Sequence, residues 1–155
     1  MNKIKKIFLW SGILVVTLIL GLVYVFVGNK YKTASIKIGE NVFKSEIAET
    51  SAQKAKGLAY RDGIEKNGAM FFDFKVDGKY PFWMMGMRFP IDIIWIKDDR
   101  VVGIEKNVLA PSLDAPVSGL KVYYPPEEIN KVLEISAGGC DELGIKIGDN
   151  FVILK

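Results

Sequence analysis

Side chains that could do chemistry are few in this sequence, and Asp92 is the most informative of them. It lies in the apolar run Ile91–Ile96, where strand alternation places residues 91, 93 and 95 on one face and 92, 94 and 96 on the other. Both faces are apolar except at Asp92, so we expect a strand that is buried on both sides and holds one embedded carboxylate. A buried ion without a partner is very costly, so Asp92 needs a cation or several hydrogen-bond donors.

Arg61 is the cation that we expect beside Asp92. It follows a short helix-like segment, and a guanidinium can bind a carboxylate through two parallel hydrogen bonds. Two interpretations stay open. In the first, Arg61 and Asp92 form a structural ion pair that fixes the helix to the sheet. In the second, they line a polar pocket together with Trp83, which a binding module would use for its ligand. A separate alternative is an enzyme that works on envelope material, with Asp92 as acid or base.

Three methionines, Met84, Met85 and Met87, form a second cluster with Phe82 and Trp83. Thioether ligands favour Cu(I), so a soft-metal binder is one alternative function for an exported protein. The aromatic side chains could instead line a groove for a sugar or a peptide. Methionine and aromatic residues in a strand mostly pack in the core, so we expect packing and no bound metal.

The rest of the composition excludes many catalytic systems. There is no histidine, which removes histidine bases, Ser-His-Asp and Cys-His nucleophiles and histidine-ligated zinc. The single cysteine, Cys140, cannot form an intramolecular disulfide, and no base or nearby positive charge activates its thiol. Glu134 should point away from the face of its neighbours and lie at the surface or rim, and Asp149 should cap a turn. We therefore expect no catalytic residue and no cofactor.

The elements that must position these residues are mostly short strands. A helix-like stretch runs from Glu49 to Tyr60, with Thr50 or Ser51 as N-cap, and Gly57 should keep it short. The β-prone runs are Ser35–Ile38, Val42–Ile47, Met70–Phe74, Tyr80–Met87, Ile91–Ile96, Val101–Ile104, Val122–Tyr124, Val132–Ile135 and Phe151–Leu154. Gly39-Glu40-Asn41 and residues 97–100 predict hairpin turns. The fold class is mainly β: a small barrel or sandwich with one short helix.

An N-terminal transmembrane helix is expected to precede this domain. Residues 7–28 are uncharged and, at 1.5 Å per residue, span about 33 Å, enough for a hydrocarbon core of roughly 30 Å. A cleavable signal peptide is the alternative, but its apolar stretch would be shorter and would end in a small-x-small site. We expect an uncleaved anchor after a basic tail (1–6), then a linker (29–34) and an exported domain (35–155).

Charge supports this division of the chain. Residues 1–32 carry five lysines and no acid, whereas the remainder carries 16 basic and 18 acidic side chains. The lysines of the tail favour a cytoplasmic N-terminus and a domain outside the cytoplasm. A nearly neutral domain without a basic stripe argues against nucleic-acid binding. The expected partner is therefore the lipid bilayer, through residues 7–28.

Several segments together resemble a known family, domain of unknown function 192. They are residues 57–61 (GLAYR), 68–74 (GAMFFDF), 82–84 (FWM), 90–96 (PIDIIWI), 132–135 (VLEI), 137–138 (AG) and 144–149 (GIKIGD). The resemblance implies a β-dominated fold and implies no activity. One departure is that Met85-Gly86-Met87 stands where the commonest family form has Lys-Asn-Thr, so any ligand contact of that triplet is altered here.

These observations lead to one functional hypothesis. The chain is expected to be a membrane-anchored domain outside the cytoplasm that acts as a non-catalytic binding or accessory module of the cell envelope. The envelope enzyme that uses Asp92 and the Cu(I) binder that uses the three methionines remain the alternatives.

Overall fold

The computed structural model describes residues 31–112 and 114–154. The predicted tail 1–6, anchor 7–28 and first two residues of the linker lie outside the described residues. Within the described part of the chain, no helix has the length and apolar character needed to cross a membrane.

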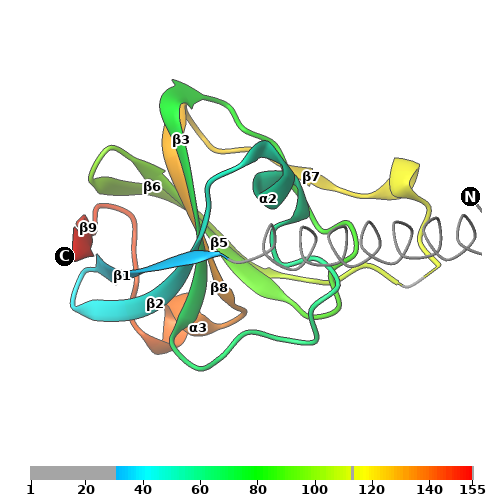
Figure 1. Cartoon of the computed structure of the whole chain (residues 1–155), viewed down its shortest axis with the longest axis horizontal. Coiled ribbons are helices and arrows are strands. Elements are labelled where there is room, and N and C mark those ends of the chain that lie inside the picture. The colour runs from blue at the N-terminus through cyan, green and yellow to red at the C-terminus, as the bar shows by residue number, and fades with distance from the viewer. Residues whose placement is uncertain (1–30, 113, 155) are drawn as a thin grey trace, which may run out of the picture. The chain divides into compact units, whose positions relative to one another are not determined.

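The domain is mainly β, as expected, and consists of nine strands with short helices between them (Figure 1). The strands are β1 (Lys32–Ile38), β2 (Asn41–Ala48), β3 (Gly68–Gly78), β4 (Phe82–Trp83), β5 (Ile91–Lys97), β6 (Arg100–Val108), β7 (Val122–Tyr123), β8 (Ile129–Ser136) and β9 (Phe151–Leu154). The helices are α2 (Ser51–Lys56), α3 (Gly139–Glu142) and the 3-10 turn η1 (Val117–Gly119).

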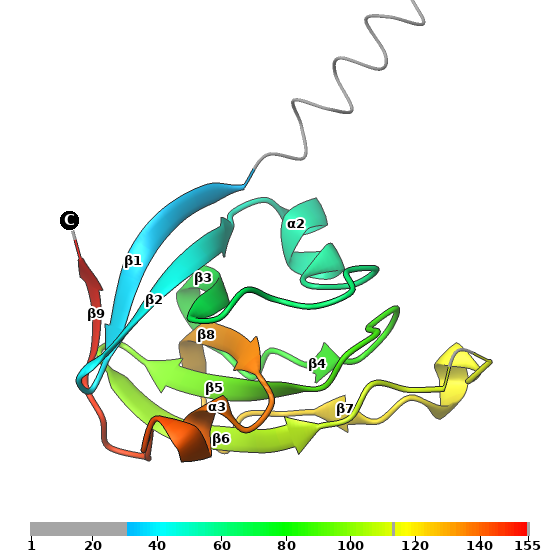
Figure 2. The same cartoon turned by 90° about the horizontal axis from the view of Figure 1, so that it is seen from below.

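Seven strands form one sheet in the order β6-β5-β8-β3-β2-β1-β9, and β4 pairs with β7 separately. All neighbours in the large sheet are antiparallel except β2 and β3, which are parallel, so the sheet is mixed. The parallel pair arises because α2 and the segment after it form a crossover between the two strands. Figure 2 shows how strongly the sheet curls.

The two edges of the curled sheet are joined at one end by backbone hydrogen bonds. The Phe151 N–H donates to the carbonyl of Asp99 (2.7 Å), and the Val101 N–H donates to the carbonyl of Asp149 (3.0 Å). Arg100 and Asn150 form an isolated antiparallel bridge at the same place. At this end, these bonds satisfy part of the edge backbone, which would otherwise be open to strands of other chains.

Both faces of the central strands β5 and β8 are buried. One face contributes Ile94 and Leu133 to an inner cluster that receives residues from all seven strands of the large sheet. The other face contributes Ile93 and Val132 to an outer cluster. Partly buried residues of β4 and β7, such as Phe82 and Tyr123, pack on this outer cluster. The expected burial of Ile91–Ile96 on both sides is confirmed.

A turn and a helix cap that the sequence predicts are present in the structure. The Gly39-Glu40-Asn41 turn joins β1 to β2, and Thr50 caps α2 in a capping box with Gln53. Gly57 is the C-cap, so the helix is short. A single helical turn, α3, lies within residues 137–144, where the sequence predicts a turn that includes one helical turn.

The predicted strand Tyr80–Met87 is wrong except at Phe82–Trp83. The segment turns instead, and the Met87 N–H donates to the carbonyl of Met84 (3.1 Å). Gly86 has φ +71°, and its carbonyl accepts from the N–H of Tyr60 (2.8 Å). A Cβ on Gly86 would lie 3.0 Å from the Tyr60 ring. Glycine is therefore required here both by backbone conformation and by close packing.

We predict that Gly86→Ala destabilises the domain more than Gly144→Ala, and that Gly63→Ala is close to neutral. Gly144 has φ +66° with nothing near its Cβ position, so it reports backbone strain alone, of about 1 kcal/mol. Gly63 has neither feature. Urea unfolding of the three variants measures the series. Equal losses at positions 86 and 144 would show that contact with Tyr60 costs nothing.

Candidate functional site

Asp92 is fully buried and is bound by backbone amides. One carboxylate oxygen accepts from the N–H groups of Asn107 (2.7 Å) and Gly138 (3.2 Å), and the other accepts from the N–H of Cys140 (2.8 Å). The carboxylate therefore joins β5 to the end of β6 and to the turn that begins α3. Asp92 is thus buried with several donors, one of the two arrangements that the sequence allows for it.

The predicted Arg61–Asp92 ion pair is wrong. Arg61 donates two hydrogen bonds to the carboxylate of Glu46 on β2, at 2.6 and 2.9 Å, and its guanidinium lies over the Tyr31 ring at 5.3 Å from the centroid. The physical reason is that Asp92 faces the inner cluster, where backbone amides reach it. Arg61 does fasten the segment after α2 to the sheet, but through Glu46.

We predict that Asp92→Ala costs at least about 3 kcal/mol, because three buried N–H groups lose their acceptor. Asp92→Asn should also be strongly destabilising, since its amide keeps one acceptor oxygen and turns an NH₂ group toward donors. The exposed Asp99→Ala serves as the control in thermal and urea unfolding. If Asp92→Asn were as stable as the parent chain, the amide contacts would not be what fixes this turn.

The methionines do not form one cluster at the surface. Met84 and Met87 are buried in the outer cluster, and Met85 and Met87 line a cavity that Met84 does not line. The thiol of Cys140 is completely buried, and burial, followed by the charge of Asp92, raises the pKa of the Cys140 thiol. A thiolate is therefore disfavoured at this position. Among the described residues, no group of three or more acidic or cysteine side chains is arranged to hold a metal ion.

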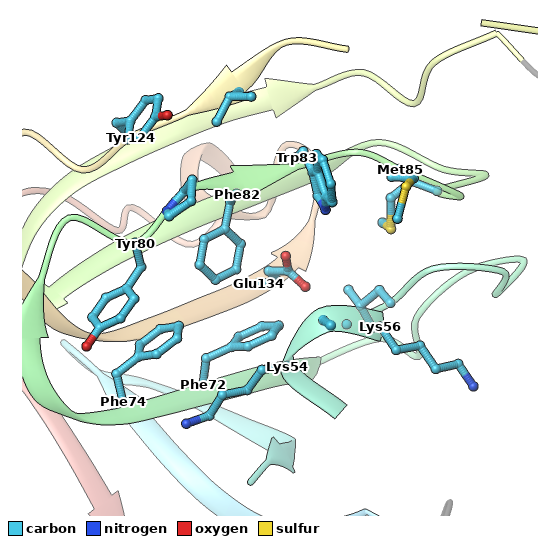
Figure 3. Close-up of a pocket in the computed structure, with 16 residues that line it drawn as sticks. Lys54, Lys56, Phe72, Phe74, Tyr80, Phe82, Trp83, Met85, Tyr124 and Glu134 are labelled. Carbon is cyan, nitrogen blue, oxygen red and sulfur yellow. The ribbon is translucent and has the colours of Figure 1, made fainter. Parts of the chain in front are cut away.

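A cavity of about 420 Å³ lies between α2, β3, β8 and the β4–β7 pair (Figure 3). Its lining is mostly apolar and strongly aromatic. The aromatic members are Phe72, Phe74, Tyr80, Phe82, Trp83 and Tyr124. Of the predicted pocket residues, Trp83 lines this cavity, whereas Arg61 and Asp92 do not.

The aromatic rings that line the cavity pack against one another. Phe74 and Tyr80 are stacked with their centroids 3.7 Å apart, and Phe82 meets Phe72 edge-on at 5.0 Å. Such pairs fix the ring orientations more firmly than area burial alone does. Trp83 remains 47% exposed, and it lies on the opposite side of the cavity from α2 (Figure 3).

Among the described residues that line the cavity, Glu134 alone has a carboxyl group, and it is 6% exposed. Its side chain lies among the aromatic rings (Figure 3). The Oε2 atom is buried without a hydrogen-bond partner among the described residues. Burial raises the pKa of the Glu134 carboxyl from 4.5 to about 8, while the positive charge of Arg61 acts in the opposite direction. The group is therefore mostly protonated at neutral pH.

The expectation that Glu134 lies at the surface or rim is wrong. Alternation does turn it away from Leu133 and Ile135, which lie in the inner cluster. That second face is also covered, because β8 is a central strand flanked by Met70 of β3 and Ile93 of β5. The burial of Glu134 follows from the central position of β8 in the sheet. The sequence does not give the strand order, so this burial could not be predicted from it.

We predict that Glu134 makes the domain less stable as pH rises. Its folded-state pKa is raised, so the unfolded chain loses the proton first, and stability falls between about pH 4.5 and 8. Glu134→Gln should remove this part of the pH dependence and should be more stable than the parent chain by a few kcal/mol above pH 8. Urea unfolding from pH 4 to 9 measures it, with the exposed Glu127→Gln as control. Parallel curves for parent and Glu134→Gln would contradict it.

The fold and the buried site define a class: a small, mainly β domain with a mixed sheet and an aromatic cavity. The model of the DUF192 family, described as "Uncharacterized ACR", matches residues 34–153, and the chain belongs to this family. The resemblance seen in the sequence is thereby confirmed. Among curated proteins, none matches the chain.

Two crystal structures are similar to the domain. A protein of unknown function from Novosphingobium aromaticivorans is 29% identical, with a TM-score of 0.72 over 80% of this chain and 87% of that chain. A candidate transcription regulator from Sinorhizobium meliloti is 24% identical, with a TM-score of 0.71 over 80% of this chain and 95% of that chain. The second likeness shows the fold alone.

Proposed function

We propose that the chain is a non-catalytic binding module of the cell envelope that holds a ligand in the aromatic cavity. The observation that carries this proposal is Glu134, a buried carboxyl group that lines the cavity and has an oxygen without a partner. Buried polar groups are nearly always hydrogen-bonded, so an unpaired one beside an open cavity calls for a partner from outside the chain. A few polar groups in an apolar pocket are what small-molecule sites have in common.

The contacts of Asp92 support a binding module over the envelope enzyme that uses this residue. Its carboxylate is closed off by three backbone N–H groups and does not line the cavity. A general acid or base must come within hydrogen-bond reach of the substrate. Glu134 lines the cavity without a second carboxyl group, so the two-carboxylate mechanisms of glycosidases lack a partner there.

The Cu(I) alternative finds little support in the positions of the methionines. Met84 and Met87 are buried among apolar side chains, and of the three methionines Met85 and Met87 line the cavity. Soft-metal sites need several sulfur ligands that converge on one point.

The N-terminal membrane anchor is part of the same proposal. Residues 7–28 form the anchor, with the N-terminus in the cytoplasm and the domain outside it. The uncharged length of this segment and the lysines before it support this arrangement. The bilayer is then a partner of the chain through its anchor only.

A cavity-blocking variant tests ligand binding. Ala55 on α2 is exposed and lines the cavity, whereas Ala52 on the same helix is exposed and does not. We expect fragments found by ligand-observed NMR with the full chain to lose binding to Ala55→Trp and to keep binding to Ala52→Trp. Fragments that bind both variants equally, or a complete absence of binders, would overturn the assignment of the cavity.

A labelling experiment tests the tether. Lys79 is exposed, and the native Cys140 is completely buried, so a cysteine introduced by Lys79→Cys should be the only reactive thiol of the domain. A membrane-impermeant maleimide should label this variant on intact cells and should leave the parent chain unlabelled. Protection until lysis would place the domain inside, and a mature N-terminus after residue 28 would rule out the anchor.

A further inference from the structure

We propose that the ligand of the aromatic cavity is an organic ammonium ion, an apolar body that carries one protonated amine and pairs with Glu134. This inference rests on the proposed function, because it assumes that the cavity binds a ligand and adds the chemical class of that ligand.

The number of polar groups in the cavity limits how many polar groups of a ligand can form hydrogen bonds there. Among the described residues of the lining, Glu134 is the only acidic side chain; the others are mostly aromatic and aliphatic, with two lysines, Lys54 and Lys56. A sugar or another polyol would bury several hydroxyl groups against these rings without partners, which is costly. A ligand with a single polar group avoids that cost.

Charge decides what this single group is. A cation within hydrogen-bond distance favours the ionised form of a carboxyl group, and a bond between two charged groups is about twice as strong as a neutral one. An anionic ligand could accept only the proton of Glu134 at this point, because the two lysines of the lining extend away from this carboxyl group (Figure 3). Its charge would then be buried without a cation beside it. An ammonium group is therefore the complement of Glu134.

The aromatic walls favour the same class of ligand. The faces of aromatic rings carry negative potential and attract ammonium groups, most strongly at tryptophan. Trp83 and Phe82 lie on one side of Glu134, and Phe72 lies on the other (Figure 3). One ring of the lining already takes a cation, since the Lys54 ammonium lies 4.8 Å from the centroid of Phe74.

Two lysines line the same cavity and do not supply the missing partner. The ammonium of Lys54 donates to the carbonyl of Asp73. The side chains of Lys54 and Lys56 both extend away from Glu134 (Figure 3). The carboxyl group therefore stays available to a ligand that enters between the rings.

Binding has a defined proton balance. In the empty cavity at pH 7 the Glu134 carboxyl holds its proton, because burial raises its pKa to about 8. The ligand arrives as an ammonium ion, the carboxyl gives up its proton to the solvent, and the ammonium N–H donates to the carboxylate. About one proton is therefore released for each cation bound.

Calorimetry on the full chain tests this with two probes of nearly equal shape, 2-phenylethylammonium and 2-phenylethanol. At pH 7 we expect the ammonium ion to bind at least about tenfold more tightly than the alcohol. Titrations in two buffers with different ionisation enthalpies should show release of about one proton for the amine and none for the alcohol. Equal affinities, or amine binding without proton release, would overturn the inference.

Three variants assign the effect to the site. Glu134→Gln keeps the shape of the side chain and should lose both the preference for the amine and the proton release, whereas the exposed Glu127→Gln should retain both. Trp83→Leu at the half-exposed ring should weaken amine binding about threefold and keep the proton release. Circular dichroism confirms that each variant is folded. A Glu134→Gln variant that still prefers the amine would overturn the pairing.

The outcomes separate this inference from the proposed function. Binders that Ala55→Trp blocks, but that show no preference for an ammonium group, would leave the cavity as a binding site and reject the ligand class. Amine binding that survives Ala55→Trp would reject both.

Discussion

Strands β5 and β8 carry apolar clusters on both of their faces, and each of them holds one carboxyl group in that apolar setting. The rest of the structure depends on how these two groups are accommodated, because a buried acid needs partners or must stay protonated. Asp92 faces the inner cluster and receives three backbone N–H groups from β6 and from the turn before α3. Glu134 faces the outer cluster and receives none. Asp92 thus connects three segments of the fold, whereas Glu134 lines the cavity.

The buried carboxyl group of Glu134 lowers the stability of the domain, and in the proposed function the same group binds the ligand. An apolar side chain of similar size would remove an oxygen, Oε2, that has no partner among the described residues. It would also remove the pH dependence that follows from the raised pKa of Glu134. A buried polar group that has no partner within the protein is expected mainly at sites of binding or catalysis. The aromatic rings around Glu134 make the site specific, since they leave a ligand few places for polar groups.

The sequence predicted what depends on local patterns. Alternation gave the two buried faces of Ile91–Ile96, and the capping signal at Thr50 gave the start of α2. Strand order lies beyond such patterns, so the parallel pairing of β2 with β3 and the burial of Glu134 were missed. The partner of Arg61 was missed for a related reason: Glu46 is next to it only after β2 and the segment after α2 are brought together.

The position of Trp83 shows how far the candidate site itself could be predicted. Trp83 was expected to line a pocket, and it does line the cavity. Its expected companions, Arg61 and Asp92, are held by other groups. The rest of the lining includes residues of α2, β3 and β7 together with Met85 and Met87. The two lysines of α2 extend away from Glu134 (Figure 3), so in the proposed complex the positive charge beside this carboxyl group comes from the ligand.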